Sequence, residues 1–145
     1  TLEEMGPRTR FQTVLPDPQF PEDAKRIILC SGKIFYDLLA ERSRQNRADV
    51  AIIRLEQLYL FPHHPLVEQL ARHPDADQVI WCQEEPQNNG AWNFVDRKIE
   101  RALRECNHRV SRPEYVGRDS AASPATGLSS VHTAQQEKLV QSALG

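Results

Sequence analysis

The sequence predicts an α/β domain of three layers, with helices on both faces of a mostly parallel sheet. Three short apolar runs, rich in β-branched residues, have the composition of strands buried on both faces; they cover residues 26–30, 50–55 and 78–83. Stretches with apolar residues at helical spacing separate the runs, and this alternation favours parallel strands joined by helical crossovers. A chain of 145 residues has room for one such domain with its own core.

The beginning of the chain is expected to be an arm or linker. Proline fixes one backbone torsion and removes a hydrogen-bond donor, so it interrupts regular structure. Residues 1–24 hold four prolines, at Pro7, Pro16, Pro18 and Pro21. We therefore divide the chain into an arm at 1–24 and a folded domain at 25–145.

The first strand, residues 26–30, is followed by Ser31, which is a good helix N-cap because its hydroxyl can accept from the free amides of a first turn. Apolar residues then recur at helical spacing, and Asn46 can close this helix. Those apolar residues are Ile34, Phe35, Leu38 and Leu39. The second strand, 50–55, leads through a loop at 59–62 into a short helix at 65–71 that carries proline in its first turn.

The third strand, residues 78–83, runs into a polar, turn-rich loop at 84–90. A helix from about 91 to 106 follows, and a fourth strand is expected at 109–116. A loop of small residues at 118–130 then precedes a last amphipathic helix that ends at Leu144. The apolar side of the last helix is predicted to hold Val131, Leu139, Val140 and Leu144; that of the helix before it, Phe94, Val95, Ile99, Ala102 and Leu103.

Charge and cysteine content narrow the class of protein. The net charge is −2, and no clustered positive field points to nucleic acid or to an anionic membrane as a partner. No apolar run approaches the roughly 20 residues that cross a bilayer. The three cysteines, Cys30, Cys82 and Cys106, are far apart in sequence, and two lie inside apolar strands. We expect reduced, structural thiols.

The strand-to-helix turn Ser31-Gly32-Lys33 is the first candidate site. Free amides and the helix dipole at such a turn can hold a phosphate. The nucleotide-binding P-loop is incomplete, however, because Ile34 stands where that motif has serine or threonine. A cap with a tight turn is the alternative interpretation.

Glu84 and Glu85 stand at the end of the third strand, where parallel sheets present ligands. Successive strand residues point to opposite faces, so the two carboxylates are not expected to act as an acid–base pair. One of them can bind a cation or an arginine of a partner. We predict that residues 84–92, with Asn88 and Trp92, form a contact loop rather than a catalytic site.

Arg118 lies at the beginning of the last candidate segment, a loop of small residues that ends at Gly127. Its guanidinium can bind a carboxylate or phosphate through two parallel hydrogen bonds, and a packed surface loop is the equally weighted alternative. The histidines and cysteines show no zinc-ligand spacing, and no nucleophile–base motif is present. The residues alone thus give an α/β domain without a complete catalytic set.

Four segments, in their order and spacing, resemble one family. They are Leu29–Lys33, Val50–Tyr59, Trp81–Pro86 with Asn88, Gly90, Ala91 and Trp92, and Tyr115–Arg118 running on to Ser123–Gly127. They look like the carboxy-terminal, transketolase-type domain of the first component of 2-oxoglutarate dehydrogenase. The resemblance covers roughly residues 25–145, and Asn89, where glutamine would be expected, is a mild departure.

This resemblance implies a thiamine diphosphate enzyme with Mg²⁺, which decarboxylates 2-oxoglutarate and succinylates the lipoyl group of the second component in the tricarboxylic acid cycle. The catalytic, cofactor-binding and metal-binding residues are expected in the preceding domains, and no cofactor is expected on this chain. The implied partners are those domains, a homodimer partner and the dihydrolipoyl succinyltransferase complex, in the cytoplasm of a bacterium or in the mitochondrial matrix.

Within such an enzyme this domain is expected to serve assembly, dimer support and shaping of the active-site channel. The alternative is an effector-binding regulatory module that holds a nucleotide-like effector or an acyl coenzyme A, with Ser31, Lys33 and Arg118 as its candidates. The full set of candidate contact or effector residues is Ser31, Lys33, Glu84, Glu85, Asn88, Trp92 and Arg118.

Overall fold

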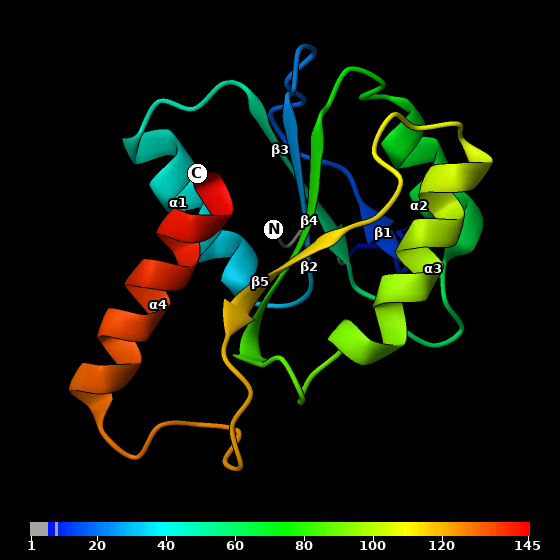
Figure 1. Cartoon of the computed structure of the whole chain (residues 1–145). Coiled ribbons are helices and arrows are strands. Elements are labelled where there is room, and N and C mark those ends of the chain that lie inside the picture. The colour runs from blue at the N-terminus through cyan, green and yellow to red at the C-terminus, as the bar shows by residue number, and fades with distance from the viewer. Residues whose placement is uncertain (1–5, 8) are drawn as a thin grey trace.

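The computed structural model describes residues 6–7 and 9–145 and contains the predicted three-layer arrangement (Figure 1). In chain order, the elements are β1 (Val14–Leu15), β2 (Arg26–Cys30), α1 (Ile34–Arg44), β3 (Val50–Leu55), α2 (His63–Ala71), β4 (Gln78–Pro86), α3 (Trp92–Glu105), β5 (Glu114–Arg118) and α4 (Ser129–Leu144). Helices α1 and α4 cover one face of the sheet, and α2 and α3 cover the other.

The sheet has five strands in the order β1-β3-β2-β4-β5. Strands β2 to β5 are parallel, and the short β1 pairs with β3 in the antiparallel sense. The expected parallel sheet is therefore confirmed. Because β2 is parallel to both of its neighbours, β3 and β4, the loops that follow these three strands leave from one edge of the sheet.

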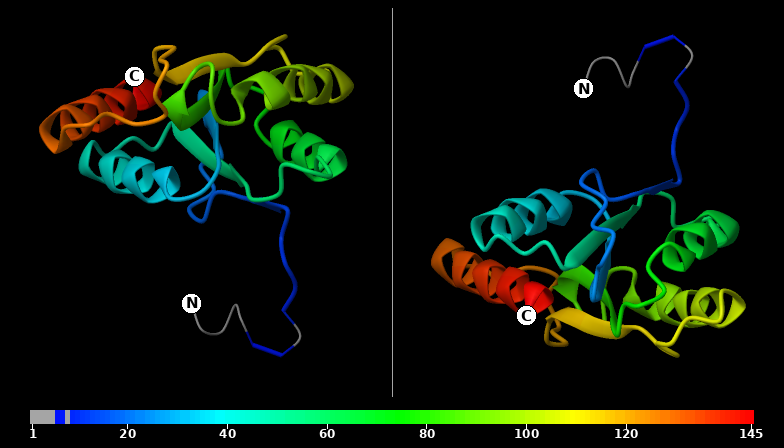
Figure 2. Two further views of the ribbon diagram at one scale, coloured as in Figure 1. Left: turned by 90° about the horizontal axis from the view of Figure 1, so that it is seen from below. Right: turned by 90° about the horizontal axis from the view of Figure 1, so that it is seen from above.

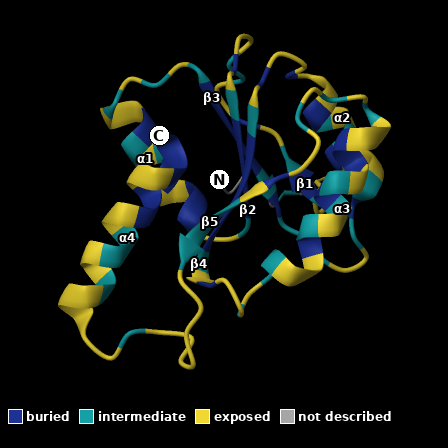
Figure 3. Ribbon diagram, in the orientation of Figure 1, coloured by how far each residue is buried: buried dark blue, intermediate teal, exposed yellow. Residues whose placement is uncertain are grey.

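Two apolar cores lie on the two faces of the sheet, and β2, β3 and most of β4 are buried between them (Figure 3). Alternate residues of one strand enter different cores: Ile27 and Leu29 face α2 and α3, whereas Ile28 and Cys30 face α1 and α4. This two-sided burial is why the strands read as continuous apolar runs in the sequence.

The segment expected to be an arm is partly built into the fold. Val14 and Leu15 pair with Leu55 and Arg54 of β3, and Asp17 is buried. The prediction that prolines would prevent regular structure was wrong here, because β1 is an edge strand that finds its hydrogen bonds in a distant neighbour. Residues 1–5 and 8 lie outside the described residues, and residues 9–12 run away from the body (Figure 2).

Two strand boundaries differ clearly from the prediction. Strand β4 continues through Glu84 and Glu85 to Pro86, so the polar loop begins later than expected. Strand β5 begins at Glu114 rather than at residue 109, because Pro113 and the polar residues before it do not pair with β4. Val131 of α4 and Phe94 of α3 are each 41% exposed, so neither belongs to the buried side of its helix, contrary to the prediction. Within the described part of the chain, none of the helices is long and apolar enough to cross a bilayer.

Candidate functional site

The candidate residues gather at the edge of the sheet where the parallel strands end. Ser31 and Lys33 follow β2, Glu84 and Glu85 lie near the end of β4, and Arg118 ends β5. Adjacent strands bring these residues together across long stretches of sequence, as the register of β2 with β4 and of β4 with β5 requires. Ligands of parallel α/β sheets bind at this edge.

Lys33 and Glu84 form an ion pair, with 2.6 Å between the lysine Nζ and the glutamate Oε1. The hydrogen bond to Glu84 raises the pKa of Lys33, so the ammonium stays charged. Gln136 of α4 donates to the same Glu84 oxygen at 3.1 Å and to Asp37 of α1 at 2.9 Å. The Glu84 carboxylate therefore links β4 to α4 through Gln136 and to the start of α1 through Lys33.

Arg118 is held by partners within the chain. One terminal nitrogen donates to the backbone carbonyl of Glu84 at 2.6 Å. The other lies 3.2 Å from His132 Nδ1 and 3.1 Å from the side-chain oxygen of Gln136, both on α4. The guanidinium thus fastens the end of β5 to β4 and α4. A bidentate contact of an external anion with both terminal nitrogens would compete with these contacts.

Ser31 does not cap helix α1. The helix begins later than expected: its N-cap position is Lys33, whose side chain makes no capping bond. The delay of two residues arises because Gly32 adopts a left-handed conformation at φ 74°. The expected Ser31 cap was therefore wrong. Ser31 instead lines an open pocket together with Lys33, Tyr59, Trp81 and Phe94.

Glu84 and Glu85 point to different sides, as the alternation of a strand requires. The Glu84 carboxylate faces α1 and α4, while Glu85 is exposed. The backbone carbonyl of Glu85 accepts from Gln83 Nε2 at 3.2 Å and from the Tyr115 hydroxyl at 3.1 Å.

Asn88 pairs with the backbone of the loop that follows β5. Its side-chain nitrogen donates to the carbonyl of Ala121 at 3.0 Å, and its side-chain oxygen accepts from the Ala121 amide at 3.0 Å. This two-way pairing imitates one step of a β-ladder and ties residues 87–90 to residues 119–126. Asn88 therefore contacts another loop of the same domain.

Gln83 organises the site, and sequence reasoning missed it. Its side chain is buried; Oε1 accepts from the Trp81 indole at 2.8 Å and from the Trp92 backbone N–H at 2.9 Å. Its Nε2 donates to the backbone carbonyls of Glu85, Pro86 and Asn89 at 3.2, 3.2 and 2.8 Å. A glutamine just inside the end of a buried strand was the available signal, since a buried amide must satisfy all its hydrogen-bonding groups.

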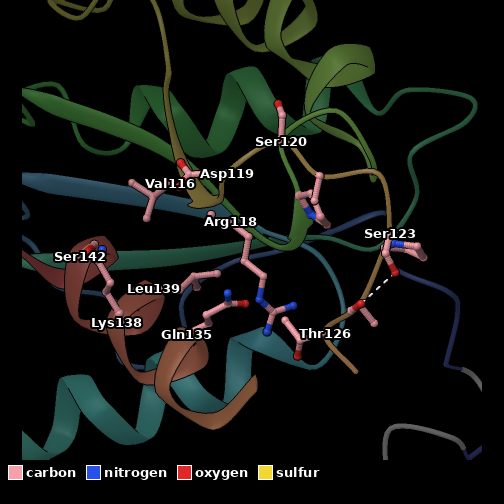
Figure 4. Close-up of a pocket in the computed structure, with 15 residues that line it drawn as sticks. Val116, Arg118, Asp119, Ser120, Ser123, Thr126, Gln135, Lys138, Leu139 and Ser142 are labelled. Atoms are coloured by element: carbon pink, nitrogen blue, oxygen red, sulfur yellow. Dashed lines mark hydrogen bonds between the residues drawn. The ribbon is translucent and has the colours of Figure 1, made fainter. Parts of the chain in front are cut away.

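A second pocket lies between the loop after β5 and helix α4. Figure 4 shows Arg118 reaching toward α4, which contributes Gln135, Lys138, Leu139 and Ser142 to the wall. The opposite wall consists of small residues of the loop, among them Ser120, Ser123 and Thr126. Arg118 Nε and Gln135 Oε1, on residues that line this pocket, are buried and make no hydrogen bond to the described residues.

The cysteines are free thiols. Cys30 and Cys82 lie side by side on paired strands and are fully buried, and Cys106 is half-buried. Burial raises the pKa of Cys82 to about 12 and also raises that of Cys30. Among the described residues, no three side chains of histidine, cysteine, aspartate or glutamate are placed to hold a metal ion.

Comparison with known proteins places this architecture in a family. The family described as 2-oxoglutarate dehydrogenase C-terminal matches residues 1–144. The chain belongs to that family. The segments that carried the sequence resemblance therefore indicated the correct family, and the strand-end residues described above are features of a 2-oxoglutarate dehydrogenase C-terminal domain.

Longer bacterial proteins contain related sequences. The 2-oxoglutarate dehydrogenase E1 component of Haemophilus influenzae is 46% identical over 136 residues, which is 92% of this chain and 14% of that protein. The E1 component of Brucella anthropi is 42% identical over 156 residues, which is 100% of this chain and 16% of that protein. This C-terminal family member thus spans about one-seventh of the length of these relatives.

A solved structure shares the fold. A chain described as "split gene transketolase, inactive beta4 tetramer" superimposes with a TM-score of 0.58 at 17% identity, over 96% of this chain and 44% of that chain. At this identity the match shows the fold alone. It confirms the expected transketolase-type C-terminal fold for this 2-oxoglutarate dehydrogenase domain.

Proposed function

We propose that this chain is the assembly domain of a 2-oxoglutarate dehydrogenase first component and supplies no group to the chemical step. The parent enzyme decarboxylates 2-oxoglutarate and succinylates the lipoyl group of the second component. The domain packs against the preceding domains, supports a homodimer and shapes the rim of the active-site channel. It works with the dihydrolipoyl succinyltransferase complex, in a bacterial cytoplasm or a mitochondrial matrix.

This proposal rests on one observation in a member of this family: the polar side chains at the strand ends bind other groups of the same domain. Glu84 binds Lys33, Arg118 binds Glu84 and α4, Asn88 binds the loop after β5, and Gln83 holds residues 85–92. Such contacts fix the shape of loops, and rigid loops make a surface complementary to a neighbour. They do not leave a nucleophile beside a base, which chemistry at this edge would require.

Thiamine diphosphate and Mg²⁺ supply the decarboxylation chemistry in the proposed parent enzyme. The described residues of this chain do not fit them, because Mg²⁺ needs a set of oxygen ligands around one point and the carboxylate of Glu84 is committed to Lys33 and Gln136. We therefore assign the cofactor to the preceding domains.

The experiment is a comparison of assembly and chemistry in the full-length enzyme that carries this chain. Glu85→Gln and Trp92→Ala are expected to lower the fraction of dimer by analytical ultracentrifugation, or the melting temperature, while single-turnover decarboxylation of 2-oxoglutarate in the remaining dimer is unchanged. Arg104→Ala, at a position 75% exposed in its side chain, is the matched surface control. Loss of the single-turnover rate in an intact dimer would contradict the proposal.

An effector-binding role is the second candidate, because Ser31, Gly32 and Lys33 line an open pocket at the start of α1 and the Lys33 side chain is 71% exposed. Calorimetric titration of the chain with ATP and with acetyl coenzyme A tests it. Binding that is lost in Lys33→Met and kept in Lys25→Met would support an effector site. Absence of heat with both compounds would leave assembly as the better supported role.

A further inference from the structure

Two large apolar side chains are presented to solvent at the tip of the loop after β3. Tyr59 is 80% exposed and Leu60 is 69% exposed. Phe94, at the start of α3, is 41% exposed and lines the same pocket as Tyr59. Tyr59, Leu60 and Phe94 together form a surface that we name the tip patch. Exposed aromatic and aliphatic groups that cluster in this way mark interaction surfaces.

The tip is an ordered part of the fold. The side-chain amide of Gln57 donates to the carbonyl of Leu60 at 2.7 Å and closes the loop on itself. At its base, the backbone N–H groups of Glu56 and Gln57 both donate to the carbonyl of Thr13, at 3.0 and 3.2 Å. A loop that is already held in one conformation loses little entropy when a partner covers it, which favours tight binding by few residues.

Phe94 is held in place as well. The ammonium of Lys98, one helical turn further on, lies 4.6 Å from the centre of the Phe94 ring and 5.8 Å from that of Phe61. This position over the ring face is the geometry of a cation–π contact. The pocket beside the tip has the buried Trp81 as part of its wall, so an apolar side chain of a partner that enters it can pack against an aromatic surface.

The segment that leads into the domain leaves next to this patch. Because β1 runs antiparallel to β3, with Val14 beside Leu55, residues before Val14 lie past the end of β3. Thr13 is bonded to the base of the tip, and residues 9–12, which precede it, lie away from the body (Figure 2). Phe11 on this segment is 68% exposed, which adds a further apolar side chain on the path toward the preceding polypeptide.

We propose that the tip patch is the docking surface for the polypeptide that precedes this domain in the same enzyme. The family is a C-terminal one, and the Haemophilus influenzae relative has 86% of its length outside the matched part, since the match covers 14% of it. That polypeptide reaches the domain through residues 9–13, beside the patch. A tethered neighbour has a high local concentration there, so a small ordered patch is enough to bind it. The inference rests on the proposed function for the identity of the neighbour.

Hydroxyl-radical footprinting of the full-length enzyme and of chain 1–145 alone tests this surface. The oxidation rates of Tyr59, Leu60 and Phe94 are expected to fall by about an order of magnitude in the full-length enzyme, because the centre of an interface excludes water. Leu128, 66% exposed at the start of α4, is the internal reference and should oxidise equally in both samples. Equal rates for the tip patch in both samples would overturn the proposal.

A variant pair sharpens the test. In the full-length enzyme, the double change Tyr59→Ser and Leu60→Ser should restore oxidation of Phe94, whereas Leu128→Ser should leave Phe94 protected. Since both tip residues are exposed, the isolated chain with the double change should keep its melting temperature. Protection in the isolated chain that grows with its concentration would instead assign the patch to a second copy and refute the tethered neighbour.

The outcome is separate from that of the proposed function. A full-length enzyme that protects the tip patch but does not turn over 2-oxoglutarate would refute the proposed function and retain the docking surface. An enzyme that turns over 2-oxoglutarate with an unprotected patch would refute the docking surface alone.

Discussion

The side-chain oxygen of Gln83 accepts a hydrogen bond from the backbone N–H of Trp92 at 2.9 Å. This bond links the end of β4 to the first residue of α3 across the loop that separates them. The same oxygen also accepts from the indole of Trp81, which is 1% exposed. One glutamine therefore sets both the position of a buried indole and the start of a helix.

Replacement of Gln83 by alanine should be among the most damaging single changes at the strand edge. It leaves the buried indole N–H and several backbone groups without partners, and each such group costs about 1–3 kcal/mol. We expect a loss of about 2–4 kcal/mol in the free energy of unfolding, measured by urea titration with circular dichroism. Gln87→Ala, at an exposed neighbouring position, should change it by less than about 0.5 kcal/mol. Similar losses in the two variants would contradict this role for Gln83.

The sequence predicts the parts of this fold that depend on burial alone. Strands β2 and β3 were expected with their observed bounds, because residues such as Ile27, Ile28 and Ile53 are apolar on both faces of the sheet. The parts that it missed depend on long-range pairing. Val14 and Leu15 form a strand only because β3 lies beside them, and no local pattern encodes such a neighbour.

In the candidate site, too, some features follow from the strand pattern and others depend on tertiary contacts. The positions of Lys33, Glu84 and Arg118 at the strand ends follow from the alternation of strands and helices, and the divergence of Glu84 and Glu85 follows from strand geometry. That Arg118 binds the Glu84 carbonyl and α4 depends on tertiary distances that a single sequence does not contain. The cap expected at Ser31 failed because Gly32 takes a positive φ.

The buried ion pair of Asp17 and Arg42 should anchor the segment before β2. Asp17 accepts from Arg42 and from the backbone N–H of Ile52, and Arg42 also donates to the carbonyl of Val50. The two side chains are 0% and 3% exposed. Asp17→Asn leaves the guanidinium buried without its counter-charge, so we expect a loss of about 3–5 kcal/mol in the free energy of unfolding.

The same urea titration provides the control for Asp17. Glu41→Gln weakens the exposed ion pair of Glu41 with Arg44 and should leave stability nearly unchanged. The double variant Asp17→Asn, Arg42→Met should lose less than the sum of the two single changes, because it leaves no unpaired buried charge. Additive losses would show that the two residues act separately.

The thiols should differ in reactivity according to burial. Burial raises the pKa of Cys82 to about 12 and that of Cys30 as well, which leaves very little thiolate at neutral pH. In native protein, a maleimide reagent should label the half-buried Cys106 at least about 100-fold faster than the other two, as followed by mass spectrometry. In urea all three should react at similar rates. Rapid native labelling of Cys30 would show that β2 opens readily.

The stability of the domain should fall with acidification through His73. Burial lowers the pKa of His73 below its ordinary value of 6.5, and the side chain is 2% exposed. Below about pH 6.5 the unfolded chain binds a proton that the folded chain does not, so the free energy of unfolding decreases as pH falls. Well above pH 6.5 both states are neutral and the effect vanishes.

His73→Gln should therefore flatten the plot of unfolding free energy against pH between 7 and 5. The limit for one histidine is about 1.4 kcal/mol per pH unit, and the half-buried His108, whose pKa burial also lowers, retains its own share of the slope. His64→Gln is the matched control, because the His64 side chain is 85% exposed. Urea titrations at half-unit pH steps measure the three slopes. An unchanged slope in His73→Gln would mean that this imidazole protonates within the folded domain as readily as in the unfolded chain.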